Sequence, residues 1–179
     1  RRRTAWARAS SAARATPHPP PPRSLCAAPR VALMGTSAGG SAAGTAGAFA
    51  APLGGGVVPK AIVASHGADS AGSRNISCPV MYASGSADPR RHKSAAAFAN
   101  CPSRPKIFAV LEGGSHMEPE RGGHLNPFDA HFMGCHLKSS NAACAKIYGH
   151  GPDSLCRQNK MTACSITTVP APAPETSAC

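Results

Sequence analysis

The stretch Val31-Ala32-Leu33-Met34-Gly35-Thr36-Ser37-Ala38-Gly39 decides the fold class of this chain. Four apolar residues lead into a Gly-x-Ser-x-Gly sequence, and residues 40–51, rich in Ala, follow it. A strand, a tight turn and a helix in this order form a nucleophile elbow, in which a serine occupies a strained turn between close-packed glycines. The five-residue motif is weak evidence alone, but its context supports it. We therefore predict a strand at 31–34, a helix at 40–51 and a nucleophilic Ser37 between them.

Three further apolar runs follow the elbow, at residues 61–64, 79–83 and 106–111. Each is short and rich in β-branched or large apolar side chains, as buried parallel strands are. Residues 91–100 lie between the last two runs and have the composition of a crossover helix. This alternation predicts an α/β fold with a doubly wound parallel sheet of about four strands.

Two polar side chains follow strands of this predicted sheet. Asp88 comes after the run at 79–83, and His116 comes after the run at 106–111. Function in such sheets collects at the carboxyl ends of the strands, where Ser37 is also expected. The sequence therefore predicts a serine, an acid and a histidine at one edge of the sheet.

In these residues the chain resembles the α/β-hydrolase superfamily, whose triad runs in the order nucleophile, acid, histidine. The phrases Gly85-Ser86-Ala87-Asp88 and Gly113-Gly114-Ser115-His116 are most similar to the dienelactone-hydrolase, cutinase and polyester-hydrolase branch. The resemblance covers about residues 30 to 135, which correspond to the C-terminal half of that fold. It implies a partial α/β-hydrolase fold.

The resemblance implies hydrolysis of a carboxylic ester through an acyl-enzyme. His116 would take the proton of Ser37, Asp88 would hold the imidazole in the correct tautomer, and the backbone N–H of Ala38 would donate to the oxyanion. The substrate would be a small or polymeric ester, and no cofactor or metal is implied. Cleavage of a peptide or thioester by the same triad stays open, because a fold does not fix its substrate.

The sequence gives weaker support for a role of other residues in the site. Thr36 flanks the nucleophile and is expected to line the acyl site. His66 follows the run at 61–64 and is expected to face the cleft and contact substrate, although a residue in such a place is more often a loop histidine with no function. Other residues of the required types fit the strand ends less well: Asp69, His124, His131 and His136. His131 and His136 are five residues apart, which does not match the spacing of a helical zinc pair.

Only about thirty residues precede the elbow strand, whereas a complete α/β-hydrolase has several strands and the second oxyanion donor there. Residues 1–29 are rich in Arg and Pro and contain no acid, so we predict a disordered basic leader or a transit peptide. The chain begins with Arg, which suggests a shortened sequence or an imperfect gene model. The elbow strand would then have one unpaired side. The alternative function is accordingly an inactive hydrolase fragment or an interaction module.

Net charge supports no second function. The formal charge is +11, but seven Arg and no acid fall in residues 1–30, and the rest holds twelve basic and eight acidic residues. Since only eight aromatic residues occur and no recognition motif is present, we expect no specific nucleic acid partner. No run approaches the ~20 apolar residues of a membrane span. The sequence does not predict an oligomeric state.

Eight cysteines are present, and no Cys-x-x-Cys spacing suggests zinc. Cys135 with Cys144 and Cys156 with Cys164 are plausible local disulfides, although four cysteines allow three connectivities. Cys78 and Cys101 form a further bridge or remain buried thiols. Disulfides imply secretion or another oxidising compartment, with an organelle as the alternative if the leader is a transit peptide. The expected organisation has four parts: a leader (1–29), the partial hydrolase domain (30–138), a Cys-rich extension (139–166) and a Pro/Ala-rich tail (167–179).

Overall fold

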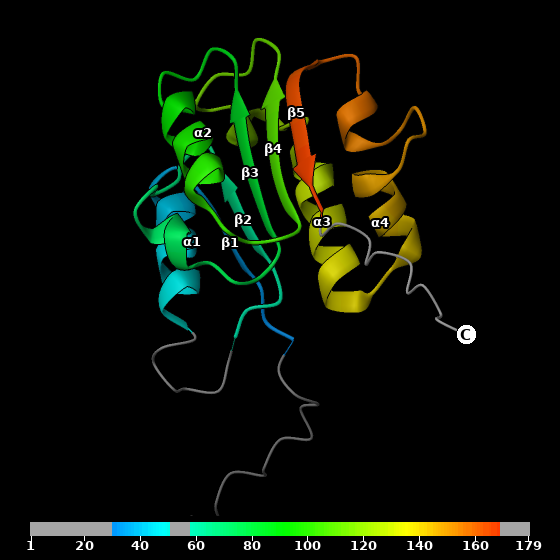
Figure 1. Cartoon of the computed structure of the whole chain (residues 1–179). Coiled ribbons are helices and arrows are strands. Elements are labelled where there is room, and N and C mark those ends of the chain that lie inside the picture. The colour runs from blue at the N-terminus through cyan, green and yellow to red at the C-terminus, as the bar shows by residue number, and fades with distance from the viewer. Residues whose placement is uncertain (1–29, 51–57, 169–179) are drawn as a thin grey trace, which may run out of the picture.

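In a computed structural model of the chain, the described residues are 30–50 and 58–168. They form an α/β fold with one five-stranded, mostly parallel sheet and helices on both of its faces (Figure 1). The predicted leader and the tail from residue 169 onward lie outside the described residues. The α/β class predicted from the sequence is confirmed.

The sheet has the strand order β1-β2-β3-β4-β5, so strands that are consecutive in the chain are neighbours. The first four strands are mutually parallel, and β5 is antiparallel to β4. Their bounds are Leu33–Thr36 (β1), Ile62–Ser65 (β2), Val80–Gly85 (β3), Lys106–Leu111 (β4) and Met161–Thr167 (β5). The four predicted runs therefore form strands, with β1 placed two residues later than expected.

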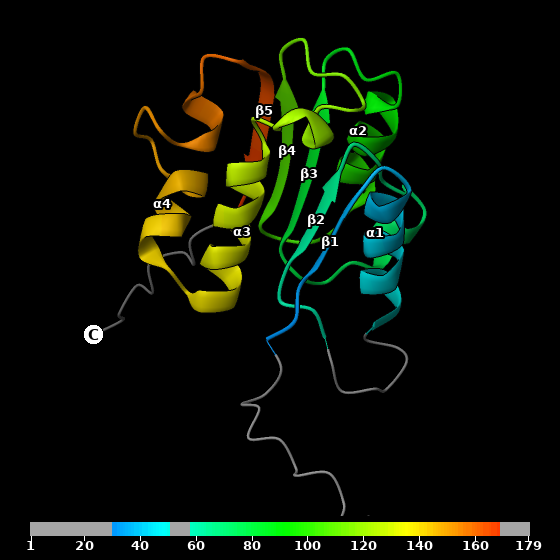
Figure 2. The same cartoon turned by 180° about the vertical axis from the view of Figure 1, so that it is seen from behind.

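Four α-helices cover the sheet. Their bounds are Ala38–Ala50 (α1), Arg91–Asn100 (α2), Asn126–Lys138 (α3) and Asn141–Tyr148 (α4). Helices α1 and α2 lie on one face, and α3 and α4 lie on the other (Figure 2). Short 3-10 turns complete the described elements at Gly72–Asn75 (η1), Pro119–Arg121 (η2) and Leu155–Arg157 (η3).

Each face of the sheet has its own hydrophobic core. Ala43 and Ala97 from α1 and α2 pack with Tyr82 and other side chains on one face. Phe132 from α3 and Ile147 from α4 pack with side chains of the central strands on the other face. Because both faces are covered, every residue of β2 and β3 is buried, which explains why these strands read as continuous apolar runs.

The fifth strand was not predicted. Residues of β5 fall in the segment expected to be a Cys-rich extension, yet β5 pairs with β4 along its whole length. The strand lies at a sheet edge and is only half-buried, so its sequence lacks the apolar run by which the inner strands are recognised. The C-terminal extension therefore completes the sheet.

Two disulfides stabilise the C-terminal region. Cys135 of α3 is bonded to Cys144 of α4, and Cys156 of η3 is bonded to Cys164 of β5. Both predicted local pairs are confirmed. Cys78 and Cys101 are buried and form no disulfide. Burial raises the pKa of the Cys78 thiol to about 11, so this thiol is protonated at neutral pH.

Strand β1 lies at the other edge of the sheet and pairs only with β2. Within residues 30–50 and 58–168 no strand pairs with its outer side. Met34 of β1 is 56% exposed, the highest exposure among the large apolar side chains described. None of the described helices has the length and apolarity that a membrane crossing requires.

Candidate active site

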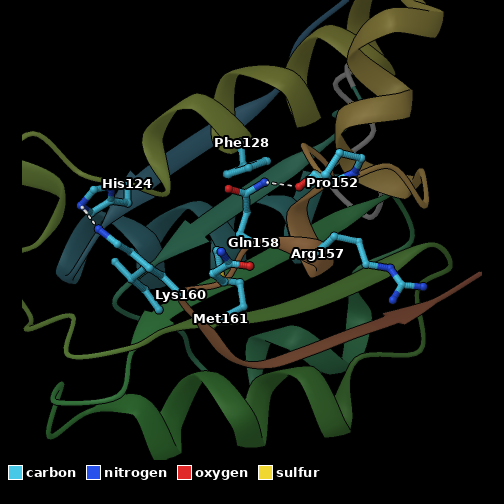
Figure 3. Close-up of a pocket in the computed structure, with 9 residues that line it drawn as sticks. His124, Phe128, Pro152, Arg157, Gln158, Lys160 and Met161 are labelled. Carbon is cyan, nitrogen blue, oxygen red and sulfur yellow. Dashed lines mark hydrogen bonds between the residues drawn. The ribbon is translucent and has the colours of Figure 1, made fainter.

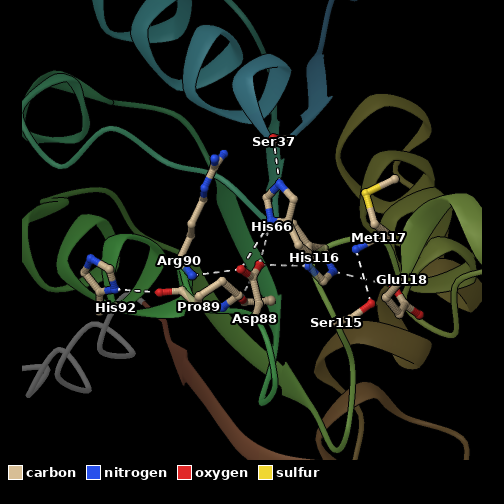
Figure 4. A network of polar contacts seen from close by, with 11 residues as sticks. Ser37, His66, Asp88, Pro89, Arg90, His92, Ser115, His116, Met117 and Glu118 are labelled. Atoms are coloured by element: carbon tan, nitrogen blue, oxygen red, sulfur yellow. Dashed lines mark hydrogen bonds and ion pairs between the residues drawn. The ribbon is translucent and has the colours of Figure 1, made fainter.

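Four polar residues meet at the carboxyl edge of the sheet, each from the loop after a different parallel strand. Ser37 follows β1, His66 follows β2, Asp88 lies three residues beyond β3, and His116 lies five residues beyond β4. Figure 4 shows their side chains linked by hydrogen bonds and ion pairs. Parallel strands end at one edge, so the topology alone brings these residues together.

Ser37 occupies a sharp turn between β1 and α1. Its φ is 57°, in the left-handed region that non-glycine residues rarely adopt. The turn is fixed from the β2 side, because the Ser37 N–H donates to the Ser65 carbonyl at 2.9 Å. Gly67 allows this close approach, since a Cβ there would lie 2.0 Å from the Ser37 carbonyl oxygen. A strained backbone therefore presents the Ser37 hydroxyl at the strand end.

The hydroxyl of Ser37 is hydrogen-bonded to a histidine that is itself bonded to an acid. Ser37 Oγ lies 2.7 Å from His116 Nε2, and His116 Nδ1 lies 3.2 and 3.1 Å from Oδ1 and Oδ2 of Asp88. A carboxylate can only accept, so His116 Nδ1–H donates to Asp88, and neutral His116 keeps an Nε2 lone pair for the Ser37 O–H. These three predicted residues thus form one hydrogen-bonded chain.

Asp88 is buried but remains ionised. Burial raises the pKa of its carboxyl, yet hydrogen bonds from the Arg90 backbone N–H, His116 and His66 outweigh burial, and the net pKa lies below the ordinary value. The Arg90 N–H donates to Oδ1 at 2.8 Å, and the Ser84 hydroxyl donates to Oδ2 at 3.4 Å. Asp88 therefore offers a charged acceptor to the imidazole of His116.

His66 lies deeper than a substrate contact would require. Its side chain is fully buried, with Nδ1 3.1 Å from Asp88 Oδ2 and Nε2 3.5 Å from Glu118 Oε2. The His66 backbone also has a left-handed φ, of 54°. The sequence placed His66 at the correct strand end, but no pattern in it indicated that the ring would turn inward to Asp88.

Thr36 and Ala38 lie on either side of Ser37, where the sequence placed them. Thr36 is the last residue of β1 and is half-buried, whereas Ala38 is exposed and is the first residue of α1. Backbone N–H groups in the first turn of a helix have no partner within the helix, so the Ala38 N–H is free to bind an anion. Their assigned roles, acyl-site lining and oxyanion donor, stay predictions.

A second acid, Asp129 of α3, lies behind the site and was missed in the sequence. Its side chain is buried and accepts a hydrogen bond from Ser65 Oγ at 3.1 Å. Burial raises its pKa to about 7, the Ser65 hydrogen bond opposes this rise, and the nearby charge of Glu118 adds to it. The only sequence signal was an acid between Phe128 and Phe132 in an otherwise apolar helix face.

The residues His66, Asp88 and His116 could also hold a metal ion by donor type. Each offers one ligand atom, and these atoms lie within 4.8 Å of one another. Both imidazoles already donate their Nδ1–H to the same carboxylate, however. Binding of a cation there would displace both protons and would break the hydrogen bonds that orient His116.

A pocket of about 380 Å³ lies near the carboxyl end of β4, in the C-terminal part of the chain (Figure 3). Three basic side chains, His124, Arg157 and Lys160, line it together with Phe128 and other residues. A smaller pocket of about 230 Å³ shares His124 with it and includes Ser115 and Glu118. These two pockets border the His116 loop, and neither is lined by Ser37.

Fold and site together define an α/β protein with a Ser-His-Asp hydrogen-bonded chain at the carboxyl edge of a mostly parallel sheet. No protein-family model and no curated protein matches the chain. Its function therefore has to be derived from the chemistry of these side chains.

Proposed function

We propose that this chain is a serine hydrolase of the α/β-hydrolase superfamily that cleaves carboxylic esters through Ser37, His116 and Asp88. The observation that carries the proposal is the continuous hydrogen-bonded chain from Ser37 Oγ through His116 to Asp88. The left-handed backbone of Ser37 at a strand-to-helix turn supports it, because such strain in a non-glycine residue is typical of functional sites.

The reaction would proceed by acyl transfer. As Ser37 Oγ attacks the ester carbonyl, its proton passes to His116 Nε2, which lies 2.7 Å away. The resulting imidazolium is stabilised by ionised Asp88 through Nδ1–H, and His116 then gives the proton to the departing alcohol. A water molecule, deprotonated by the same nitrogen, attacks the acyl-enzyme and releases the carboxylic acid, which regenerates Ser37.

Negative charge develops on the carbonyl oxygen in the transition state. The N–H of Ala38, an exposed residue at the positive end of the α1 dipole, would donate to this oxygen. Removal of one such donor typically costs about 10²–10³ in turnover. The second donor of the superfamily comes from a loop upstream of the nucleophile, and residues 1–29 lie outside the described part of the chain.

The substrate would be a small or polymeric ester bound over an open surface. Ser37 and Thr36 are half-buried and Ala38 is exposed, so acyl groups could approach the serine directly from solvent. The two disulfides are consistent with an oxidising compartment, and we propose a secreted enzyme.

Labelling with a fluorophosphonate, read by intact mass, tests the proposal without a choice of substrate. We expect one adduct on the wild-type chain, and no adduct on Ser37→Ala or His116→Ala. Ser41→Ala is the matched control, because Ser41 lies one turn further along α1 and should not affect labelling. Hydrolysis of p-nitrophenyl esters should follow the same pattern.

The contrasting outcome is a folded chain that takes up no reagent. It would mean that Ser37 is not activated and would favour the inactive fragment or interaction module. An adduct that persists in Ser37→Ala would place the reactive serine elsewhere and would refute the assignment. Thioester and peptide cleavage would be separated from ester cleavage by a panel of substrates with matched acyl groups.

A further inference from the structure

We propose that His66 and Glu118 are positioning residues of this hydrolase: His66 donates to Asp88 and, through Glu118, fastens the loop that carries His116 to the end of β2. The inference rests on the proposed function, and it extends that function to two residues outside the triad. The arrangement amounts to a second acid–histidine contact behind the first, with both imidazoles sharing one carboxylate (Figure 4).

The first observation behind the proposal is that His66 and His116 share the carboxylate of Asp88. Asp88 Oδ2 lies 3.1 Å from the Nδ1 atoms of both His66 and His116, and the two rings are nearly perpendicular, at 81°. The Asp88 side chain has no exposed surface, so its oxygens depend on donors from the protein. His66 therefore fixes the rotation of the carboxylate, and this rotation sets where His116 is held.

The second observation concerns Nε2 of His66, the ring nitrogen that does not contact Asp88. Nε2 faces Glu118 Oε2 at 3.5 Å, within ion-pair distance, and neither atom has a hydrogen-bond partner among the described residues. Since Nδ1–H is donated to Asp88, Nε2 is the ring atom left to face the Glu118 carboxyl group in a buried space. A proton on either atom would join the two, because that atom could then donate to the other.

Glu118 ties this contact to the catalytic loop. It lies two residues after His116, its backbone N–H donates to Ser115 at 3.1 Å, and its Oε1 accepts the N–H of His124. The Glu118 side chain thus connects His124, at the far end of residues 115–124, to His66, while its backbone closes a turn onto Ser115. His116 is consequently held from two sides, by Asp88 directly and by Glu118 through the loop.

The backbone of His66 supplies an independent observation. A φ of 54° lies in the left-handed region that non-glycine residues adopt uncommonly, and glycine would adopt it with less strain. The His66 N–H is nevertheless anchored to the Ala83 carbonyl at 2.7 Å, which fixes this conformation. A strained residue at this position is explained if its ring is needed against Asp88.

Variants that keep or remove the donor test the inference. His66→Asn retains an N–H at the position of Nδ1 and suits the left-handed backbone, whereas His66→Ala retains neither the donor nor the contact with Glu118. With p-nitrophenyl butyrate, we expect His66→Ala to lower kcat about 10- to 100-fold with KM changed less than about twofold. His66→Asn, which keeps the donor to Asp88 but not the contact with Glu118, should lie between His66→Ala and wild type.

Substitutions of Glu118, which contacts His66, provide a second test. Glu118→Ala should lower kcat about tenfold, and Glu118→Gln, which can donate to Nε2, should stay within about threefold of wild type. Glu120→Ala is the matched control, because Glu120 lies in the same loop with an exposed side chain. Wild-type kcat in folded His66→Ala would overturn the inference. A raised KM at unchanged kcat would also overturn it and would restore His66 as a substrate contact.

Histidine side-chain NMR separates this inference from the proposed function, because it needs no activity. In the Ser37→Ala chain we expect two downfield Nδ1–H protons hydrogen-bonded to Asp88, one lost in His66→Asn and the other in His116→Asn. A single such resonance, assigned to His116, would overturn the inference even in an active enzyme. Two resonances in a chain that does not label would refute the hydrolase and leave the paired histidines in place.

Discussion

Asp129→Asn should make the protein more stable, and the gain should grow with pH. Asp129 is 1% exposed, and its pKa rises from 3.8 to about 7 on folding, chiefly because of burial. Between pH 3.8 and about pH 7, the Asp129 carboxyl is ionised in the unfolded chain but still protonated in the folded chain. The folded state therefore loses stability as pH rises from about 4 to about 7, and the loss is constant above that range.

The magnitude follows from this difference in pKa. At about 1.4 kcal/mol per pH unit, Asp129 costs about 2 kcal/mol of stability at pH 5 and about 4 kcal/mol at pH 8. Asparagine keeps an oxygen that can accept the Ser65 hydroxyl but does not titrate. Any cost of leaving its amide N–H unpaired is the same at both pH values. The stability of Asp129→Asn relative to wild type should thus be about 2–3 kcal/mol more favourable at pH 8 than at pH 5.

Urea unfolding at pH 5 and pH 8, followed by circular dichroism, measures this difference. Asp153→Asn is the control, because Asp153 is 78% exposed and pairs only with Lys146, so its effect should stay within about 0.5 kcal/mol at both pH values. Equal effects of Asp129→Asn at pH 5 and pH 8 would refute the reasoning, since Asp129 would then not carry a proton specific to the folded state.

The other predictions concern the backbone around Ser37 and the disulfides. Ser37→Gly should be about 1 kcal/mol more stable than Ser37→Ala in thermal unfolding, because glycine removes the strain of the left-handed φ; equal stabilities would contradict this. Gly67→Ala should lose about 2 kcal/mol or more, together with fluorophosphonate labelling, because its Cβ would meet the Ser37 carbonyl, whereas Gly151→Ala, with open space around it, should be neutral. Replacing Cys135 and Cys144 together by Ala should lower the free energy of unfolding by about 2–3 kcal/mol, and a value near zero in urea unfolding would show that the bond constrains little.

The inner strands and the first two helices could be predicted because their signals are local. The strand at 106–111 and the helix at 91–100 have the predicted bounds. A short apolar run, or an alanine-rich segment between turn-forming residues, indicates its secondary structure without information from the rest of the chain. The strand β5 could not be predicted in this way. Three of its seven residues are exposed at a sheet edge and none is buried, so its place depends on pairing with β4, which is distant in the sequence.

The candidate site also contains residues that local sequence indicates and residues that it does not. Ser37, Asp88 and His116 were placed at strand ends from motif and order, and the structure brings them within hydrogen-bond distance. Glu118 and Asp129 gave no comparable signal in the sequence. A buried acid is identified by the residues around it in the folded structure, and these are distant from it in the chain. Likewise, the inward turn of His66 depends on its backbone φ, which no residue pattern encodes.

The strand that carries Ser37 has one hydrogen-bonded neighbour in the described structure, whereas the strands before His66, Asp88 and His116 each have two. Local opening therefore requires fewer broken contacts at β1 than anywhere else in the parallel part of the sheet. Gentle heating or low denaturant should therefore move Ser37 away from His66, Asp88 and His116 before the rest of the protein unfolds. On the proposed function, activity would be lost before the core unfolds, because one edge strand is less stable than the rest of the sheet.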